Sequence, residues 1–243
     1  MLKRYGWMCY DHLGGVVLYN VLWSVLNLPY LACAYAIAKT GFALGPWGAV
    51  GGGVLAVVVA FFSPPSTLAY WVCAAWVRRQ EVGLGDALRS LKGFYLRAQL
   101  LQLALLAISA TLVLNAAFYS DFAGWWGLFL GALMAWLLLG LTAVALYILP
   151  LLVTQDTGMG ETLRKSALLA VAHAGGSLFQ CAVFGVFLVV GAFSGVGMFC
   201  GVFTAWSLWM SLYMRGVLMR YTGEEWDEEA PRSLREILRP WES

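Results

Sequence analysis

The stretch Ser166–Met214, SALLAVAHAGGSLFQCAVFGVFLVVGAFSGVGMFCGVFTAWSLWMSLYM, decides the fold. Its 49 residues contain no Asp, Glu, Lys or Arg, and only His173 can become charged near neutral pH. About 20 apolar residues cross the hydrocarbon layer of a bilayer. The stretch is therefore long enough for two crossings, joined by a glycine-rich turn around Gly191, Gly195 and Gly197. It predicts a membrane protein.

The composition of the whole chain agrees with this prediction. Hydrophobic residues make up 61% of the 243 residues and charged residues 12%, and the mean hydropathy is +0.76. Soluble domains carry about 25% charged residues, so a soluble protein is excluded. The net charge of +2 gives no reason to expect nucleic acid as a partner.

Charge-free runs divide the rest of the chain into further crossings. The run from Thr40 to Val77 is too long for one straight crossing, and Ser63-Pro64-Pro65 interrupts it, so we expect a kink or break there. The sequence predicts an all-α polytopic protein, with residues 1–243 forming one membrane domain of six transmembrane helices in three hairpins. The expected spans are 13–38, 47–77, 98–119, 124–152, 173–192 and 196–219, and short interfacial cytoplasmic helices are expected over 84–95, 159–170 and 231–240.

Basic residues gather on one side of this arrangement. With six spans and a cytoplasmic N-terminus, only Lys39 falls outside. Short cytoplasmic loops carry an excess of Lys and Arg, so we expect both termini in the cytoplasm. The residues expected inside are Lys3, Arg4, Arg78, Arg79, Arg89, Lys92, Arg97, Arg164, Lys165, Arg215, Arg220, Arg232, Arg235 and Arg239.

A short sequence element occurs twice. Residues 83–90, GLGDALRS, align with residues 158–165, GMGETLRK, and a weaker third copy lies at Ser233–Glu236. In the first two copies glycines are followed by an acidic residue, which favours the positive N-terminus of a helix. Each of these two copies therefore predicts a turn and the start of a helix.

The helix expected after the first copy has an apolar side formed by Leu84, Leu88, Leu91 and Tyr95. This pattern is typical of a helix that lies along the inner leaflet. Such a helix either anchors the hairpin or docks to a cytoplasmic partner or a transporter's motor subunit, and both roles stay open. The candidate docking residues are Leu84, Leu88, Arg89, Lys92, Leu163, Arg164 and Lys165.

Polar residues form a second candidate site inside the membrane. Asn20, Ser24 and Asn27 recur at helical spacing on the first span, and the interruption Ser63-Pro64-Pro65 lies on the second. Polar side chains in spans usually bond to a neighbouring helix, at about 1 kcal/mol each. The alternative is a pathway for a small polar solute, because a broken helix exposes carbonyls.

Catalytic and metal-binding patterns are weak. Gly83–Asp86 matches the GxGD motif of intramembrane aspartyl proteases, but that chemistry needs two adjacent carboxylates. Asp11 and Glu161 are the options for the second one, and recurrence of the motif at a helix start favours capping instead. His12 and His173 lack metal-ligand spacing. We expect no enzyme, no catalytic residue, no metal site and no cofactor.

Several residues together resemble a known family. Asn20, Leu22, Trp23, Leu28 and Pro29 are similar to the N-x-L-W…L-P opening of the YesL-like family, and further similarities follow in the same order along the chain. These are Pro65-Ser66-Thr67 with Ala69, Arg78-Arg79-Gln80-Glu81, Gly93-Phe94-Tyr95, Leu149-Pro150 and 163–169, LRKSALL. The resemblance implies an integral membrane protein of the bacterial cytoplasmic (inner) membrane, often associated with carbohydrate uptake systems, and no established activity.

Two functions are therefore expected. The first is a non-enzymatic accessory or scaffold protein that binds another membrane complex, with a carbohydrate importer as the implied partner. The alternative is a small-solute transporter or channel that uses the polar stripe of the first span and the proline break of the second. The pairs Gly48–Gly52, Gly127–Gly131 and Gly197–Gly201 permit close helix contact, and self-association stays open.

Overall fold

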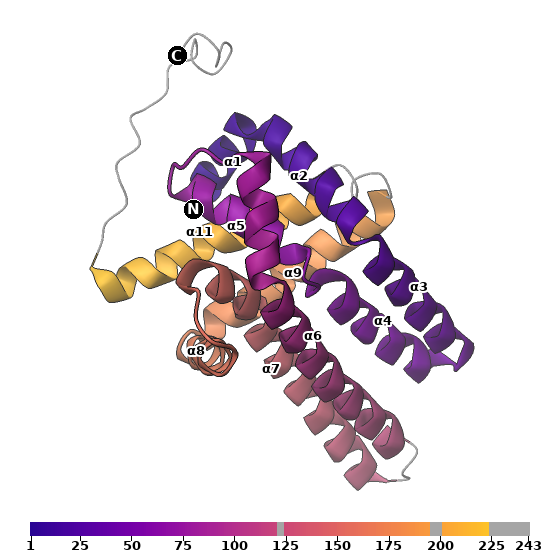
Figure 1. Ribbon diagram of the computed structural model, residues 1–243. Coiled ribbons are helices and arrows are strands. Elements are labelled where there is room, and N and C mark those ends of the chain that lie inside the picture. The colour runs from indigo at the N-terminus through magenta and orange to yellow at the C-terminus, as the bar shows by residue number, and fades with distance from the viewer. Residues whose placement is uncertain (121–123, 195–200, 224–243) are drawn as a thin grey trace.

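The computed structural model describes residues 1–120, 124–194 and 201–223. These residues form ten α-helices and no strand, which confirms the all-α class (Figure 1). The helices are α1 (Leu2–Asp11), α2 (Leu13–Leu26), α3 (Leu28–Ala43), α4 (Pro46–Phe61), α5 (Ser66–Val77), α6 (Leu84–Ser120), α7 (Trp125–Gln155), α8 (Met159–Ala172), α9 (Ala174–Ser194) and α11 (Val202–Thr222).

Among the described helices, α6, α7 and α9 are each long and apolar enough to cross a membrane. Two bent pairs, α2 with α3 and α4 with α5, raise the number of candidate spans to five. Helix α11 does not meet this test. It carries Arg215 and Arg220, and its serines Ser207 and Ser211 are buried against other helices. The six-span topology therefore stays a prediction.

Both bends lie where prolines interrupt a helix. The bend between α2 and α3 is 66° and follows Asn27, two residues before Pro29; that between α4 and α5 is 58° and spans Phe62–Pro65. Proline has no amide hydrogen and its ring clashes with the preceding turn. The kink expected at Ser63-Pro64-Pro65 is therefore present. The bend at Asn27, inside the expected span 13–38, was not anticipated.

The expectation of a separate interfacial helix over 84–95 and a span over 98–119 was wrong. The two segments form one continuous helix, α6, of 37 residues. No glycine or proline lies between Phe94 and Ser120 to end it. At 1.5 Å per residue the helix is about 55 Å long, longer than the hydrocarbon layer of about 30 Å. If α6 crosses a membrane, its charged first part, residues 84–97, therefore extends beyond that layer.

The later expectations have mixed outcomes. Helix α8 covers the segment expected at 159–170, and α9 covers the one expected at 173–192. Helix α11 covers most of the segment expected at 196–219, while residues 196–200 and the helix expected at 231–240 lie outside the described residues. Helix α1 was not expected. With α1 the chain shows a recurring order. A segment with charged residues, namely α1, the start of α6 or α8, precedes each group of apolar helices.

Two of the connections between helices are formed by a single histidine, and the same pattern of residues follows each of them. His12 links α1 to α2, which begins with Leu13-Gly14-Gly15, and His173 links α8 to α9, which begins with Ala174-Gly175-Gly176. At both joints the second glycine faces an aromatic ring of a returning helix. A Cβ on Gly15 would lie 2.8 Å from the ring of Trp76, and one on Gly176 would lie 2.3 Å from the hydroxyl of Tyr213. The glycines therefore allow each hairpin to close tightly at its joint.

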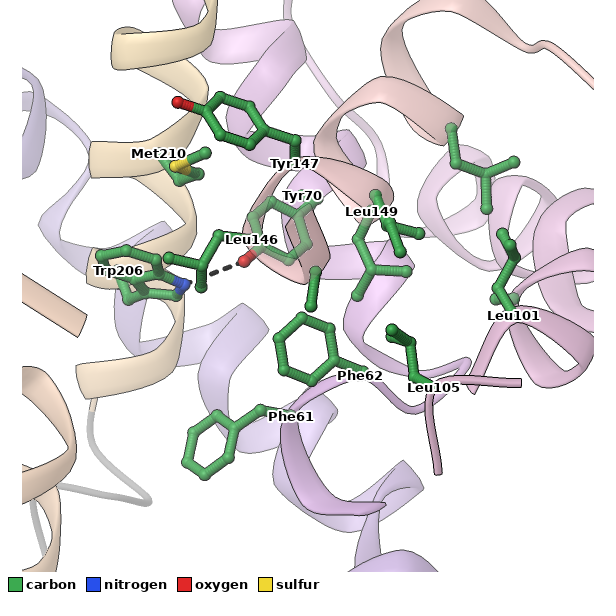
Figure 2. Packing of buried hydrophobic residues seen from close by; sticks show 14 of the residues in the cluster. Phe61, Phe62, Tyr70, Leu101, Leu105, Leu146, Tyr147, Leu149, Trp206 and Met210 are labelled. Atoms are coloured by element: carbon green, nitrogen blue, oxygen red, sulfur yellow. Dashed lines mark hydrogen bonds between the residues drawn. The ribbon is translucent and has the colours of Figure 1, made fainter. Parts of the chain in front are cut away.

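The main core lies where α4, α5, α6, α7 and α11 meet (Figure 2). Phe61 and Phe62 end α4 there, Leu101 and Leu105 come from α6, and Leu146 and Tyr147 come from α7. Trp206 of α11 donates its indole N–H to the hydroxyl of Tyr70 at 2.9 Å, which satisfies a polar group that burial would otherwise penalise.

Helices α3 and α4 pack through glycines. A Cβ on Gly41 would lie 2.4 Å from the carbonyl oxygen of Gly48 and 2.9 Å from Cα of Gly52. The pair Gly48–Gly52 therefore serves a contact within the chain, as small residues commonly do between membrane helices.

Candidate functional site

Two of the polar residues expected inside the membrane, Asn27 and Ser63, meet at the two bends. Asn27 donates its side-chain N–H to the carbonyl of Ala60 at 2.8 Å, and the hydroxyl of Ser63 donates to Oδ1 of Asn27 at 2.7 Å. In an unbroken helix the carbonyl of Ala60 would accept the amide hydrogen of residue 64. Because that residue is proline, Asn27 supplies the missing donor. The bend of one hairpin arm thus stabilises the bend of the other.

Trp23 and Ser66 extend this cluster. The indole N–H of Trp23 donates to the hydroxyl of Ser66 at 3.1 Å, and the Ser66 hydroxyl lies 3.1 Å from that of Ser63. Trp23, Asn27, Ser63 and Ser66 are all fully buried. Their polar atoms are bonded to one another and to the backbone, as helix packing requires.

Asn20 caps a different helix. Its Oδ1 accepts the backbone N–H groups of Phe203 at 3.1 Å and Thr204 at 3.0 Å, in the first turn of α11. These amides have no intrahelical acceptor, and the N-cap residue, Gly201, has no side chain to supply one. Asn20 of α2 therefore takes the role that an N-cap side chain would have for α11.

Ser24 is the exception on the stripe. It is 3% exposed, and its hydroxyl has no hydrogen-bond partner among the described residues. The stripe thus contains two asparagines that join helices and one serine that does not. As Asn20, Asn27 and Ser63 are already bonded within the chain, the geometry favours helix packing over a solute pathway for this site.

The two copies of the repeated element, residues 83–90 and 158–165, start helices in the same way. Gly83 and Gly158 precede the first residues of α6 and α8, and Asp86 and Glu161 lie in the first turns. Each acidic residue pairs with a cation one turn later: Asp86 with Arg89 at 3.6 Å and Glu161 with Lys165 at 2.8 Å. Both helices begin at the positions that the repeat predicts.

The candidate docking residues of α6 are exposed. Leu84 and Leu88 are 44% and 38% exposed, the side chain of Arg89 is 85% exposed, and Lys92 is exposed. Helix α6 packs inward instead through Ala87, Phe94, Ala98 and Leu101. The exposed leucines and cations thus form one accessible face at the start of α6.

The docking residues of α8 are less accessible. Leu163 is partly buried against the core, and Lys165 donates to the side chain of Gln155 at 2.7 Å besides its pairing with Glu161. Arg164 is exposed. Of the three residues expected here, Arg164 is therefore the one most available to a partner.

An open pocket of about 490 Å³ borders the exposed face of α6. Arg97 closes one side of it by binding Asp156 at 2.7 Å and the carbonyl of Thr157 at 3.2 Å, which ties α6 to the loop before α8. The pocket is lined by Trp71, Asp86, Arg89, Ser90, Gly93, Phe94, Arg97 and Asp156. It combines aromatic, cationic and acidic groups.

Asp86 and Asp156 line this pocket together, yet they do not resemble a protease dyad. In such a dyad the two carboxylates share a proton. Here Asp86 pairs with Arg89, and Asp156 pairs with Arg97. Each carboxylate is therefore paired with its own cation and not with the other carboxylate. Glu161, one of the options for a second catalytic carboxylate, pairs with Lys165.

The two histidines lie at separate joints. The ring of His12 stacks on that of Trp76 with centroids 4.6 Å apart, and Nε2 of His173 lies 3.0 Å from the hydroxyl of Tyr221. Burial lowers the pKa of His12, and the nearby charge of Asp11 opposes this shift. Within the described ranges, no group of three or more His, Cys, Asp or Glu side chains is placed to hold a metal ion.

Sequence reasoning missed two features of these sites. Trp23 and Ser66 bond across the bends, although both occur within the motifs that were compared with the YesL-like family. The capping of α11 joins Asn20 to Thr204, which lies more than 180 positions later in the sequence. No local sequence pattern predicts such a contact.

No protein-family model matches the chain, and comparisons with curated proteins and with solved structures find no match either.

Proposed function

We propose that the chain is a non-enzymatic accessory or scaffold protein of the bacterial cytoplasmic membrane, which binds another membrane complex. The observation that carries this proposal is the accessible face at the start of α6. Leu84, Leu88, Arg89 and Lys92 are exposed there beside an open pocket. By contrast, Asn20 and Asn27 inside the helices are engaged in bonds within the chain.

The partner belongs to the same proposal. A face that joins leucines to cations suits a partner with an apolar ridge flanked by acidic residues. The resemblance to the YesL-like family suggests a carbohydrate importer as the complex. In this arrangement both termini and the basic helix ends face the cytoplasm.

The test is capture of a membrane partner in mild detergent by the tagged full chain. We expect a partner in a fixed ratio to be retained by the wild-type protein and strongly reduced with the double charge reversal Arg89→Glu/Arg164→Glu. The control Lys3→Glu/Arg220→Glu changes the net charge equally at other exposed cations and should retain the partner. Equal capture by the wild-type protein and the Arg89→Glu/Arg164→Glu variant would refute the docking face.

A small-solute transporter is the second candidate. A cavity of about 410 Å³ lies between α4, α6, α7 and α9, beside Phe62 at the bend. Its walls are mainly aliphatic and aromatic, Ser109 and Thr142 contribute hydroxyls, and none of Asn20, Ser24 and Asn27 lines it. Such walls fit an apolar solute better than a sugar. Solute uptake by the purified protein in liposomes would favour this function over the accessory role.

A further inference from the structure

The cavity of about 410 Å³ between α4, α6, α7 and α9 contains a polar group that the fold leaves unused. Ser109 of α6 lines this cavity and is 2% exposed, yet its hydroxyl makes no hydrogen bond to any described residue. A helical hydroxyl commonly bonds the carbonyl four residues earlier. Thr142, which also lines the cavity, does so with Leu138 at 2.9 Å. The hydroxyl of Ser109 is therefore available to a ligand.

The rest of the lining selects an uncharged hydrocarbon. None of the described residues that line the cavity is charged, and Val58, Phe62, Leu105 and Phe184 form part of its apolar walls. A charged ligand would lose its hydration there without gaining partners. The volume equals that of about 14 water molecules at about 30 Å³ each, so a ligand with roughly that number of non-hydrogen atoms fits.

Two glycines leave room for such a ligand. Gly53 of α4 and Gly185 of α9 line the cavity, and a Cβ on either would have no atom within 4 Å. They differ in this from Gly41, whose Cβ would meet the backbone of α4. A larger side chain at Gly53 or Gly185 would therefore occupy the cavity without a clash at its Cβ.

The depth of Ser109 in its helix narrows the class of ligand. Ser109 lies about 18 Å along the axis from Arg97, within the apolar part of α6. The polar groups of a phospholipid lie outside the hydrocarbon layer, so they do not reach this hydroxyl when α6 crosses a membrane. A carbonyl oxygen is satisfied by one donor, which a single hydroxyl supplies, whereas an alcohol also has a proton to donate.

We propose that this cavity binds an uncharged hydrocarbon molecule with one carbonyl group, such as a long-chain ketone. The hydroxyl of Ser109 donates to the carbonyl oxygen, and the hydrocarbon chain lies against the walls formed by α4 and α9. This site is independent of the docking face on α6. It gives the second candidate function a class of ligand, but binding there does not require that the ligand be transported.

Competitive photolabelling of the purified full chain in lipid nanodiscs tests the proposal. The probe is an analogue of tridecan-2-one with a diazirine in the middle of its chain, and mass spectrometry measures its attachment to the segments of α4 and α9 that line the cavity. We expect excess unlabelled tridecan-2-one to abolish this labelling. In Ser109→Ala about fivefold more ketone should be needed, because one hydrogen bond is lost, while the potency of tridecane as a competitor should not change.

Two glycine variants test the cavity itself. Gly185→Leu should fill it and remove the labelling of α4 that the ketone competes for. Gly140→Leu is the matched control, because Gly140 is exposed on α7, does not line the cavity and also has open space at its Cβ. The control should be labelled like the wild-type protein. Leucine favours a helix over glycine, so both variants should fold.

Three results would overturn the proposal. The first is labelling that excess ketone does not reduce, which would indicate contact with bulk lipid only. The others are an equal effect of Ser109→Ala on the ketone and on tridecane, and unchanged labelling in Gly185→Leu. Should Ser109→Ala fail to fold, the Gly185→Leu result decides. Capture of a membrane partner does not enter this experiment, so its outcome is separate from that of the docking test.

Discussion

Replacing Asn27 by alanine should destabilise the fold through the paired bends. The change removes the bond to the carbonyl of Ala60 and the bond from the hydroxyl of Ser63. The Ser63 hydroxyl, 3.1 Å from the Ala60 carbonyl, can turn to satisfy it in part. Two buried bonds are then reduced to one, and a small cavity remains, so we expect a loss of about 2 kcal/mol in the free energy of unfolding.

Equilibrium unfolding of the purified protein in bicelles measures this loss. Ser24→Ala is the matched control on the same stripe, because the Ser24 hydroxyl is buried without a partner among the described residues, and its removal should cost little. Pro64→Ala restores an amide hydrogen to the Ala60 carbonyl, so in that background Asn27→Ala should cost less than about 1 kcal/mol. The reasoning fails if Asn27→Ala is neutral, or if its cost is the same with and without Pro64.

Two further predictions concern packing and pH. Gly41→Ala should lower the thermal unfolding midpoint, at a cost of about 2 kcal/mol, because its Cβ would meet the backbone of α4. Gly53→Ala, with no atom within 4 Å of its Cβ, should raise the midpoint slightly through helix propensity; the reverse order would contradict the close contact of α3 with α4. Since burial lowers the pKa of His12, the unfolded chain takes up this proton first as the pH falls, and stability should drop below about pH 6.5. His12→Phe keeps a ring on Trp76 and should flatten the fall, whereas an unchanged pH profile would exclude His12 as its source.

Much of the fold follows from local patterns in the sequence. The apolar runs predict the helices, the two GxG elements predict where α6 and α8 begin, and Pro64-Pro65 predicts the second bend. The expected break after Tyr95 was wrong because an amphipathic pattern says which face of a helix is apolar, and says nothing about where the helix ends. That depends on a breaker such as Pro64-Pro65, and α6 contains no proline.

The candidate sites were less predictable because they depend on distant pairs. The helical spacing of Asn20, Ser24 and Asn27 shows that they share one face of a helix. It does not show that the three residues have different roles. In the structure Asn20 caps α11, Asn27 replaces the donor that Pro64 lacks, and Ser24 bonds to no described residue. These different roles are set by the helices that pack against α2, which a local pattern does not specify.

The central claim is that the basic helix ends all face one side of a membrane, and a map of cysteine accessibility tests it most directly. In a chain whose five native cysteines are replaced by alanine, single cysteines are placed at Leu88 and Leu163 and at Leu44 and Trp125, near the tips of the α3–α4 and α6–α7 hairpins. With a membrane-impermeant thiol reagent on intact cells, we expect labelling of the two tip positions and protection of positions 88 and 163 until the membrane is opened. Labelling of positions 88 and 163 from opposite sides would contradict the account.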